Sequence, residues 1–378
     1  MADRLAPVAV EHVAQVQEAV RAFDRVTVRG SGTKPALAIA PSYDRAQPLD
    51  LRGLRGIVEY EPQEYTFTAR AGTPLAEVND LLAANGQYLP FDPVLVEAGA
   101  TLGGTVASGL SGSGRLRYGG VRDFILGVRF VDGSGATVQG GGKVVKNAAG
   151  FDFPKLLTGS IGRLGVIVEV SFKVFPAPPA YRSLLVHFPS LSPALEAIYA
   201  LTTQPFDLVA LDLLPNDESG SAKEGWTLAL RIGGAEALLV SRLDRVQRII
   251  AGGDAVSSLA GDAEARFWRE AAEFAWAPAA ATLIKIALTP TQIAALESRL
   301  VATPVPRRYT VAGNVLWIAW PDALAKLDSM LDELGLAGVV VRGQATVPWI
   351  GRAPTSAFAR RIKSALDPHD KFAPLYPD

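Results

Sequence analysis

The chain has 378 residues, of which 49% are hydrophobic and 20% charged, and its 37 Lys and Arg nearly balance its 38 Asp and Glu. A chain of this length suggests two or three packed units, because one domain usually takes roughly 100 to 200 residues. The charge balance argues against nucleic-acid binding, which needs an excess of positive charge, and the absence of cysteine excludes disulfides, thiolate zinc sites and Cys-ligated iron–sulfur clusters.

The N-terminal segment and the hydropathy pattern indicate a cytoplasmic protein. Charges at Asp3, Arg4, Glu11 and Arg21 leave no apolar stretch of the kind a secretory signal needs. No uncharged apolar run reaches the roughly 18 to 20 residues that span a bilayer. Any association with a membrane is therefore expected only through partner subunits.

The first half of the chain predicts a strand-rich unit. A helix is expected near its start, because apolar residues recur at helical spacing between residues 13 and 23. A second helix is expected to begin with Thr73 as N-cap and Pro74 at its first position, and to end near Gly86. Strands are expected at residues 26–28, 56–60, 66–71, 124–131 and 166–174. Prolines at 176, 178 and 179 then mark the expected domain boundary.

The second half repeats one order of elements. Strand, helix, two strands and helix are expected between residues 182 and 251, followed by an extra helix at 263–274. A similar order recurs at 281–288, 290–301, 307–320, 322–334 and 338–342. Two copies of such a unit suggest an antiparallel sheet with helices on one face, and hence an α+β fold.

Three glycine-rich segments of the first half carry the chemistry. In the first, Arg29-Gly30-Ser31-Gly32-Thr33-Lys34, two glycines after a strand allow a turn whose N–H groups form an anion nest. An ordinary turn between strands is the alternative reading of this segment.

The second segment is Thr101-Leu102-Gly103-Gly104-Thr105-Val106-Ala107-Ser108-Gly109. Its small residues follow one another too densely for a core strand or a stable helix, which favours backbone packed against a ligand. A glycine-rich surface loop is the alternative. In the third, Lys146 to Asp152 leads to Thr158-Gly159-Ser160-Ile161-Gly162-Arg163-Leu164-Gly165-Val166-Ile167. A Rossmann fingerprint, which needs G-x-G-x-x-G between an early strand and a helix, is absent.

These segments, together with Ala71-Gly72-Thr73-Pro74-Leu75, Leu89-Pro90 and Val121-Arg122-Asp123-Phe124, occur in the order seen in the E-type FAD-binding subunits of glycolate oxidase. The chain therefore resembles that family, which has the FAD-binding fold of p-cresol methylhydroxylase and vanillyl-alcohol oxidase. The resemblance covers residues 25 to 180 and is faint afterwards.

The resemblance implies a two-subdomain FAD-binding domain at 1–178, an antiparallel-sheet cap at 179–345 and a C-terminal segment at 346–378 that returns to the FAD domain. It places the pyrophosphate at residues 30–34 and 103–105, with Ser108 and the main chain of Val166 and Ile167 near adenosine or ribityl groups. The expected cofactor-binding residues are Arg29, Gly30, Ser31, Gly32, Thr33, Lys34, Pro90, Thr101, Gly103, Gly104, Thr105, Ser108, Gly109, Gly162, Gly165, Val166 and Ile167.

Two departures from the family pattern affect these expectations. Thr33 stands where relatives that tether flavin carry histidine, which predicts non-covalent FAD. The usual C-terminal Asn-Pro-Gly is replaced by a stretch from Phe372 to Tyr376, and a Gly-Gly-His-Ala-Thr-like segment has Gln344 in place of histidine.

Catalytic residues are not assigned. The histidines His12, His187 and His369 form no cluster, so no catalytic metal is expected. Arginines can hold a carboxylate in a bidentate way, and the candidates are Arg307, Arg308, Arg342 and Arg352. Lys285 is expected to face solvent, and Lys146 to lie nearer the flavin or to anchor its loop. The region of Trp317, Trp320 and Trp349 is either a partner surface or part of the core.

The resemblance implies an FAD-binding oxidoreductase subunit that transfers electrons within a glycolate oxidase complex, with a D-type FAD subunit and an iron–sulfur subunit as partners. A small 2-hydroxy acid is the expected substrate at the level of the complex. Two alternatives stay open: an assembly subunit with a lost or weakened flavin site, and a free-standing FAD-dependent hydroxy-acid dehydrogenase.

Overall fold

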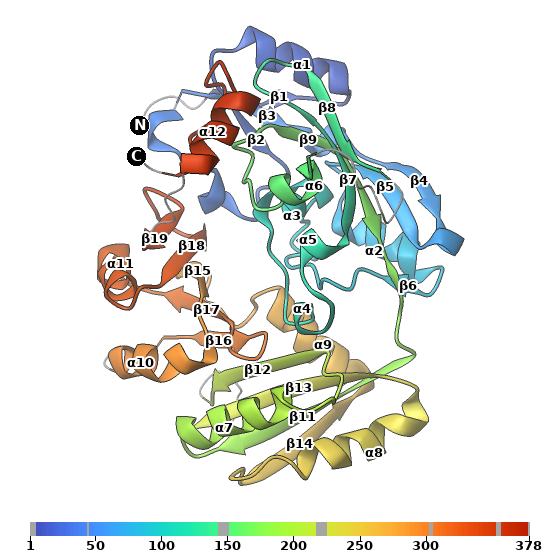
Figure 1. Ribbon diagram of the computed structural model, residues 1–378, viewed down its shortest axis with the longest axis vertical. Coiled ribbons are helices and arrows are strands. Elements are labelled where there is room, and N and C mark those ends of the chain that lie inside the picture. Colours follow the sequence, from blue (N-terminus) through green and yellow to red (C-terminus); the bar gives the residue numbers. More distant parts are fainter. Residues whose placement is uncertain are drawn as a thin grey trace.

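The computed structural model describes residues 5–43, 45–142, 151–216, 225–301, 305–352 and 357–376. These residues form an α+β structure with sheets of three, five, nine and two strands. Figure 1 shows the smaller sheets in an N-terminal unit and the nine-stranded sheet, here called the cap sheet, beside and below it. No described helix is long and apolar enough to cross a membrane.

The N-terminal unit contains two main sheets. A three-stranded parallel sheet has the order β1-β3-β2, and a five-stranded antiparallel sheet has the order β4-β5-β9-β7-β8. Their strands are β1 (Val8–Ala9), β2 (Val26–Arg29), β3 (Gln47–Asp50), β4 (Ile57–Glu61), β5 (Thr66–Arg70), β7 (Ile125–Val131), β8 (Thr137–Gly141) and β9 (Val166–Lys173). The short strands β6 (Gln87–Tyr88) and β10 (Phe175–Pro176) pair with each other.

Strand β9 contributes side chains to two different hydrophobic cores, one on each of its faces. Val166 and Val168 are buried with Val16 and Val20 of helix α1 (Val13–Ala22), whereas Ile167 between them is buried in the larger core on the other face. This arrangement follows from the period of two that places successive strand residues on opposite faces. The other helices of the unit are α2 (Leu75–Ala83), α3 (Leu102–Ser108), α4 (Arg115–Tyr118), α5 (Val121–Phe124) and α6 (Phe153–Leu157).

The start of α2 differs by one residue from the expectation. Pro74, not Thr73, is the N-cap, and the helix begins at Leu75. The Thr73 hydroxyl instead donates to the Arg70 carbonyl at 2.7 Å and accepts from the Gly56 N–H at 2.9 Å. Thr73 therefore closes the turn between β5 and α2, and it does not cap the helix.

The two expected copies of the second half merge into one cap sheet. Its order is β14-β11-β13-β12-β16-β17-β15-β18-β19, and every pair in it is antiparallel. The two copies meet where Leu213 of β12 pairs with Tyr309 of β16. The strands are β11 (Ala180–Phe188), β12 (Ala210–Pro215), β13 (Trp226–Gly234), β14 (Ala255–Ala260), β15 (Thr282–Ala287), β16 (Arg307–Thr310), β17 (Val315–Trp320), β18 (Ala337–Arg342) and β19 (Trp349–Gly351).

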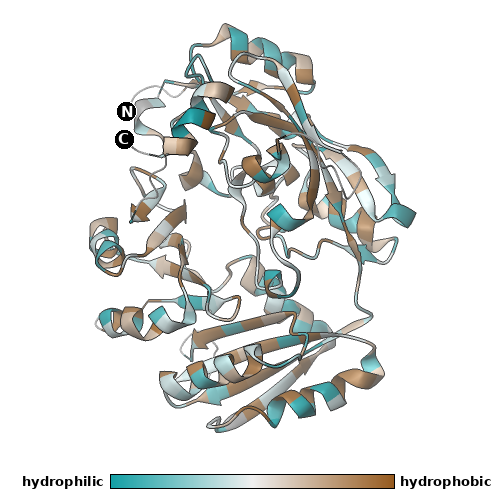
Figure 2. Cartoon of the chain, in the orientation of Figure 1, coloured by the Kyte–Doolittle hydropathy of each residue, from teal (hydrophilic) through white to brown (hydrophobic). Residues whose placement is uncertain are grey.

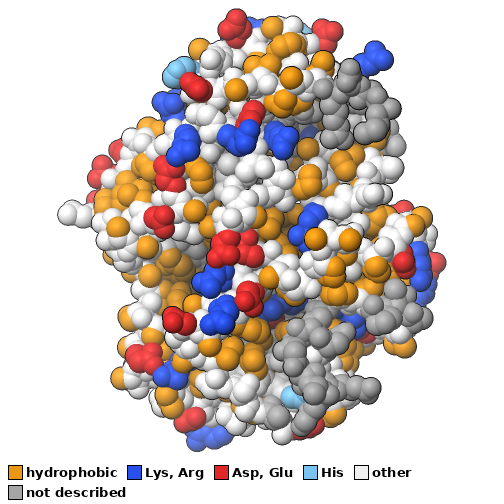
Figure 3. All heavy atoms as spheres, turned by 180° about the vertical axis from the view of Figure 1, so that it is seen from behind, with side chains coloured by type: hydrophobic (Ala, Val, Ile, Leu, Met, Phe, Trp, Pro, Cys, Tyr) orange, Lys and Arg blue, Asp and Glu red, His pale blue; other side chains and the backbone are white. Residues whose placement is uncertain are grey.

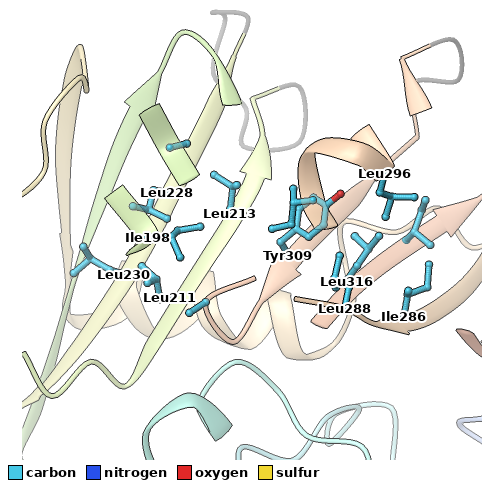
Figure 4. Packing of buried hydrophobic residues seen from close by; sticks show 14 of the residues in the cluster. Ile198, Leu211, Leu213, Leu228, Leu230, Ile286, Leu288, Leu296, Tyr309 and Leu316 are labelled. Atoms are coloured by element: carbon cyan, nitrogen blue, oxygen red, sulfur yellow. The ribbon is translucent and has the colours of Figure 1, made fainter. Parts of the chain in front are cut away.

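One core extends along the cap sheet. Four helices, α7 (Leu191–Thr202), α8 (Glu236–Gln247), α10 (Pro290–Leu300) and α11 (Leu324–Glu333), bury their apolar residues in it. Figure 4 shows Leu211 and Leu228 of the first copy in the same layer as Tyr309 and Leu316 of the second. Figure 2 shows hydrophobic residues, in brown, recurring along the strands of the cap sheet and on part of each covering helix, with hydrophilic residues between them.

Three details of the cap were not expected. Strands β14 and β19 were missed, and helix α9 (Gly261–Ala272) packs on the opposite face of the sheet, where Trp268 contacts the cluster of Ala210, Leu214 and Ala229. That face also meets the N-terminal unit: Leu283, Trp317 and Val341 share a core with residues of the first half such as Phe91 and Phe124. The partner-surface reading of Trp317 and Trp320 is wrong, because both are at most 2% exposed.

The C-terminal residues return to the N-terminal unit. The Val26 N–H donates to the Lys371 carbonyl, the Gly133 N–H donates to the Leu366 carbonyl, and Phe372 is fully buried beside β2 and α1. Helix α12 (Ala357–Leu366) lies near β2 in Figure 1. The division at residues 178 and 345 stays a proposal; β19 pairs with β18 within the cap sheet.

Candidate functional site

The three glycine-rich segments converge in the N-terminal unit. A side chain at Gly30 would lie 2.5 Å from the Thr101 hydroxyl, which places the first segment against the start of the second. Gly109, at the end of α3, lies against Gly159, and the Ile161 N–H donates to the Ala107 carbonyl at 2.8 Å. Segments that lie far apart in the sequence thus border one region.

The first segment offers backbone donors. It connects β2 to a 3-10 helix, Pro35–Ala38, and Gly32 has a φ of 75°, which favours glycine. Among the described residues, the N–H groups of residues 31–34 find no hydrogen-bond acceptor. Such a run of free N–H groups suits a phosphate group.

Lys34 adds a cationic side chain to the first segment. Burial lowers its pKa to about 8, against the opposing effect of the Glu273 carboxylate in the cap. Its Nζ donates to the Thr33 hydroxyl at 3.3 Å. A bound anion would raise this pKa again, because an adjacent negative charge favours the ammonium form.

The second segment is a helix, which corrects the expectation that it could not form one. Thr101 caps α3 by accepting from the Gly104 N–H at 3.3 Å, and Gly109 ends it with a φ of 62°. Leu102 and Val106, four residues apart, are fully buried on one face. The surface-loop alternative is wrong for the same reason.

The two adjacent glycines of α3 differ in what surrounds them. A side chain on Gly103 would lie 2.6 Å from the Ala71 Cβ and 2.9 Å from its carbonyl oxygen, so the protein itself requires glycine there. A side chain on Gly104 would meet only the Thr101 hydroxyl, at 3.0 Å. The open side of α3 is therefore at Gly104.

Two buried hydroxyls at this site have no partner among the described residues. They belong to Thr105 on α3 and Ser160 in the third segment, which are 1% and 3% exposed. A buried polar group without a partner costs about 1–3 kcal/mol. These hydroxyls therefore fit a ligand with hydrogen-bonding groups. The Ser108 hydroxyl, in contrast, already donates to the Thr105 carbonyl at 3.1 Å.

The third segment is described from Phe151 onward, and Lys146 lies outside the described residues. A side chain on Gly162 would lie 3.6 Å from the Val28 Cβ, an ordinary contact, whereas one on Gly165 would lie only 2.7 Å from the Phe130 ring and collide with it. Gly165 is thus explained by packing against β7. Val166 and Ile167 pair with β7, and β5 pairs with β9 only from Glu169 onward. Pro90 is buried next to Phe91 of the core.

Arg163 fastens the C-terminal tail to this site. Its guanidinium donates to the Pro374 carbonyl at 2.5 Å and to the Ile39 carbonyl at 2.9 Å. The side chain is buried, and this burial lowers its pKa to about 10. The contacts that Arg163 makes with the altered tail therefore use backbone carbonyls and do not depend on which side chains the tail carries, whereas Phe372 holds the same stretch by burying its ring in the core.

Replacing Arg163 by methionine is expected to lower the free energy of unfolding by about 2 kcal/mol, because charged hydrogen bonds contribute about 1.5–3 kcal/mol each and the tail carbonyls lose their donor. The measurements are the thermal midpoint and the rate at which carboxypeptidase removes the tail. Arg55→Met is the matched control, since that side chain is 61% exposed. Equal effects of both variants would contradict the role given to Arg163.

A second polar cluster lies between the N-terminal unit and the cap sheet. Asp212 of β12 accepts from the Ser113 hydroxyl at 2.5 Å and from the Arg308 Nε at 2.7 Å. Burial raises the pKa of Asp212, while Arg308 and Ser113 oppose that rise. Asp92 accepts from the Gly114 N–H at 2.9 Å, and burial raises its pKa as well.

This cluster borders a small cavity. Asp92, Ser113, Trp276 and Arg308 line it, and its volume is about 10 Å³, comparable to one water molecule. The Asp212 Oδ1, the Arg308 Nη2 and the Trp276 Nε1 are buried without a partner among the described residues. The cavity is too small for an organic acid and fits a bound water.

The candidate carboxylate-binding residues of the cap are dispersed. Arg307 is bidentate with Glu297, and Arg308 pairs with Asp212. Arg342 donates to the Ala277 carbonyl at 3.2 Å, and Arg352 is exposed. Lys285 does not face solvent as expected: it is half-buried, and this burial lowers its pKa to about 8, with Arg115 adding to the effect.

Among the described residues, no group of three or more His, Asp or Glu side chains could hold a metal ion. His187 is buried near Asp254, and His369 lies in an open surface hollow with Arg21 and Lys371.

On the face shown in Figure 3, basic and acidic side chains of the described residues are interspersed without a broad patch of one sign.

Sequence reasoning missed Asp92, Ser113, Ser160 and Asp212. One signal was present: Asp212 is an acidic residue inside the apolar strand of residues 210–215. The pairing of Asp212 with Arg308, 96 positions away, follows only from the sheet order, and no local pattern indicates it.

Comparison with known proteins identifies a family for this chain. Residues 5–141 match a family described as an FAD binding domain. The chain is 36% identical to glycolate oxidase subunit GlcE of Escherichia coli K12 over 259 residues, which are 68% of this chain and 67% of that protein. It is 27% identical to glycolate oxidase subunit GlcD of Bacillus subtilis over 190 residues, 50% of this chain and 38% of that protein.

Solved structures share the fold. The chain superimposes on p-cresol methylhydroxylase with substrate bound at a TM-score of 0.72 and 14% identity, covering 98% of this chain and 88% of that one. It superimposes on alkyldihydroxyacetonephosphate synthase at a TM-score of 0.72 and 16% identity, covering 97% and 75%. At these identities the likeness establishes the fold alone.

Proposed function

Because this chain belongs to the GlcE family of glycolate oxidase subunits, we propose that it is an FAD-binding oxidoreductase subunit of a glycolate oxidase-type complex acting on a small 2-hydroxy acid. The observation that carries the proposal is the convergence of three glycine-rich segments on free N–H groups and two unpartnered buried hydroxyls. This combination fits a cofactor with a pyrophosphate and many hydrogen-bonding groups.

We propose a role in FAD binding for each of the three glycine-rich segments. The N–H groups of residues 31–34 and the Lys34 ammonium would hold the pyrophosphate, and the open side of α3 at Gly104 would give it room. The Thr105 and Ser160 hydroxyls would take up further hydrogen bonds. Bound FAD would supply the two-electron acceptor of the oxidation. The other cofactor-binding residues expected from the sequence, of which Arg29 is the first and Ile167 the last, remain part of this proposal.

We propose a D-type FAD subunit and an iron–sulfur subunit as partners, because the family is named after a subunit of glycolate oxidase and this chain has no cysteine with which to hold a cluster. The substrate is assigned at the level of the complex, and nucleic acid is not a partner. We propose a cytoplasmic location with membrane attachment only through partner subunits, which fractionation of cells with and without those subunits would test.

The flavin is expected to be bound without a covalent link. Thr33 is the residue in the first segment where a tethering histidine would stand, and the chain has no cysteine. Acid precipitation of the purified holoprotein should therefore leave a colourless pellet and a yellow supernatant. A pellet that stays yellow would contradict this expectation.

The proposed function is tested by an absorption spectrum of the purified chain, followed by anaerobic addition of glycolate or D-lactate. Flavin bands near 370 and 450 nm, about the usual positions for this cofactor, that do not bleach would support an electron-transferring FAD subunit. Bleaching by either acid would identify a dehydrogenase in its own right. A chain that stays colourless with added FAD would favour an assembly role and contradict the proposal.

A further inference from the structure

Strand β14 forms an unpaired edge of the cap sheet. It pairs with β11 on one side and is the last strand in the sheet order, so no strand of the described residues lies on its other side. Figure 1 shows it at the rim of the molecule, away from the N-terminal unit. Alternate residues of a strand turn their N–H and C=O groups away from the neighbouring strand, so β14 presents a row of backbone donors and acceptors outward.

The side chains of β14 leave this edge open. Val256 is 42% exposed, although Val186, which lies opposite it on β11, is only 1% exposed. Ser257 and Ser258 in the middle of β14 are exposed as well. The core beneath the cap helices therefore ends at β11 on this side of the sheet, one strand short of the edge.

β14 also lacks the features that keep edge strands from pairing. Proteins protect such strands with charged side chains, proline or a short length. The edge strand β4 of the five-stranded sheet carries Glu59 and Glu61, and β19, at the other end of the cap sheet, has three residues. β14 has six residues and neither a charge nor a proline. Its outward backbone groups suit another β-strand.

We propose that β14 pairs antiparallel with β14 of a second copy of this chain, which joins two cap sheets into one. An interface of this kind brings the same surface of both copies together about a two-fold axis, so the surface has to be self-complementary. A charged edge would repel its own copy, whereas β14 is uncharged along its whole length. This property favours a second copy as the occupant of the edge.

The aspartates that flank β14 select one register. Opposite residues of an antiparallel pair lie on the same face of the sheet, so the two-fold axis passes between two copies of one residue. An axis at Ser258 would place Asp254 in line with Asp262 of the copy, and like charges opposite each other are unfavourable. An axis at Ser257 places Asp254 in line with Ala260. In this register Ser257 meets Ser257 of the copy.

Analytical ultracentrifugation of the purified chain over a range of concentrations tests the pairing. The expected result is a reversible dimer with twice the chain mass of 40.0 kDa. Ser257→Lys places two like charges opposite each other and should weaken the self-association at least about tenfold. Ser298→Lys, at an exposed position of α10, is the matched control and should associate like the parent. Both variants should keep the thermal midpoint of the dilute parent, because exposed substitutions change stability little.

A single introduced thiol reports the register, because the chain has no cysteine. Ser257→Cys should oxidise to a disulfide-linked dimer, since the two copies of this residue lie directly opposite each other. Ser258→Cys should stay unlinked, because its counterpart lies diagonally across the pair, beyond the reach of a disulfide. Ser298→Cys is the control for thiols that meet only by collision, and it should stay unlinked as well.

Three results would overturn the inference: a parent chain that is monomeric at every concentration, a Ser257→Lys variant that dimerises like the parent, and a Ser258→Cys variant that links as fast as Ser257→Cys. A monomeric parent whose binding to a co-expressed partner subunit is lost in Ser257→Lys would assign the edge to a different protein, which also contradicts the pairing of two copies. β14 contains none of the three glycine-rich segments, so the flavin content of all these variants should match that of the parent.

Discussion

Replacing Gly104 by valine is expected to abolish FAD binding and to leave the fold intact. A side chain at this position meets only the Thr101 hydroxyl, so two valine methyl groups would extend into the space beside α3 that we assign to the cofactor. We expect FAD affinity to fall roughly 100-fold or more, about 3 kcal/mol of binding free energy. The measurements are flavin content after purification and the dissociation constant of added FAD.

The stability of the Gly104→Val variant should change little. Valine is a somewhat better helix former than glycine, so the change within α3 should stay below about 1 kcal/mol. Gly103→Ala is the contrasting variant, because its single methyl group would collide with Ala71 and should cost about 1–3 kcal/mol or more by overpacking. Full flavin occupancy in Gly104→Val would show that the pyrophosphate lies elsewhere.

Replacing Arg308 by methionine is expected to cost about 3–5 kcal/mol of unfolding free energy, because it leaves a buried carboxylate without its counter-charge. Asp212 is fully buried, and the Ser113 hydroxyl would be its remaining hydrogen-bond donor among the described residues. This cluster joins the N-terminal unit to the cap sheet, so its loss should also loosen their contact. Chemical unfolding, followed by fluorescence of the buried tryptophans, measures the effect.

The cost of Arg308→Met should depend on pH. Burial already raises the pKa of Asp212, and removal of the guanidinium would raise it further. A carboxyl whose pKa is raised in the folded state binds protons more tightly than in the unfolded state, so its folded form loses stability as pH rises through that range. The variant should therefore be less destabilised at pH 5 than at pH 7.5.

A compensating substitution provides the control for this pair. Adding Asp212→Leu to Arg308→Met removes both charges, and replacing a buried ion pair by apolar residues is often nearly neutral. The double variant should therefore recover most of the lost stability. A double variant that is less stable than Arg308→Met alone would show that Arg308 acts through packing against Phe267 and Trp268 and not through Asp212.

The predicted elements were reliable where one periodic pattern dominated. Strand β9 was expected at 166–174 and lies at Val166–Lys173, because alternation along a half-buried strand is unambiguous. Helix α3 was missed because its glycines depress helix propensity. Its stability comes from the Thr101 cap and from Leu102 and Val106 in the core, which are tertiary effects.

By itself the sequence determined the order of elements, the three glycine-rich segments and the family they indicate, because glycine positions and hydrophobic periodicity are local properties of the chain. It could not determine that Ala71 leaves no room for a side chain at Gly103, whereas a side chain at Gly104 would meet only the Thr101 hydroxyl, because the two glycines are adjacent and share one sequence context. Only the tertiary structure placed Asp212 beside Arg308. The pairing of strands β12 and β16 in the cap sheet brings these two charges together from positions 96 residues apart, and no local pattern in the sequence encodes that pairing.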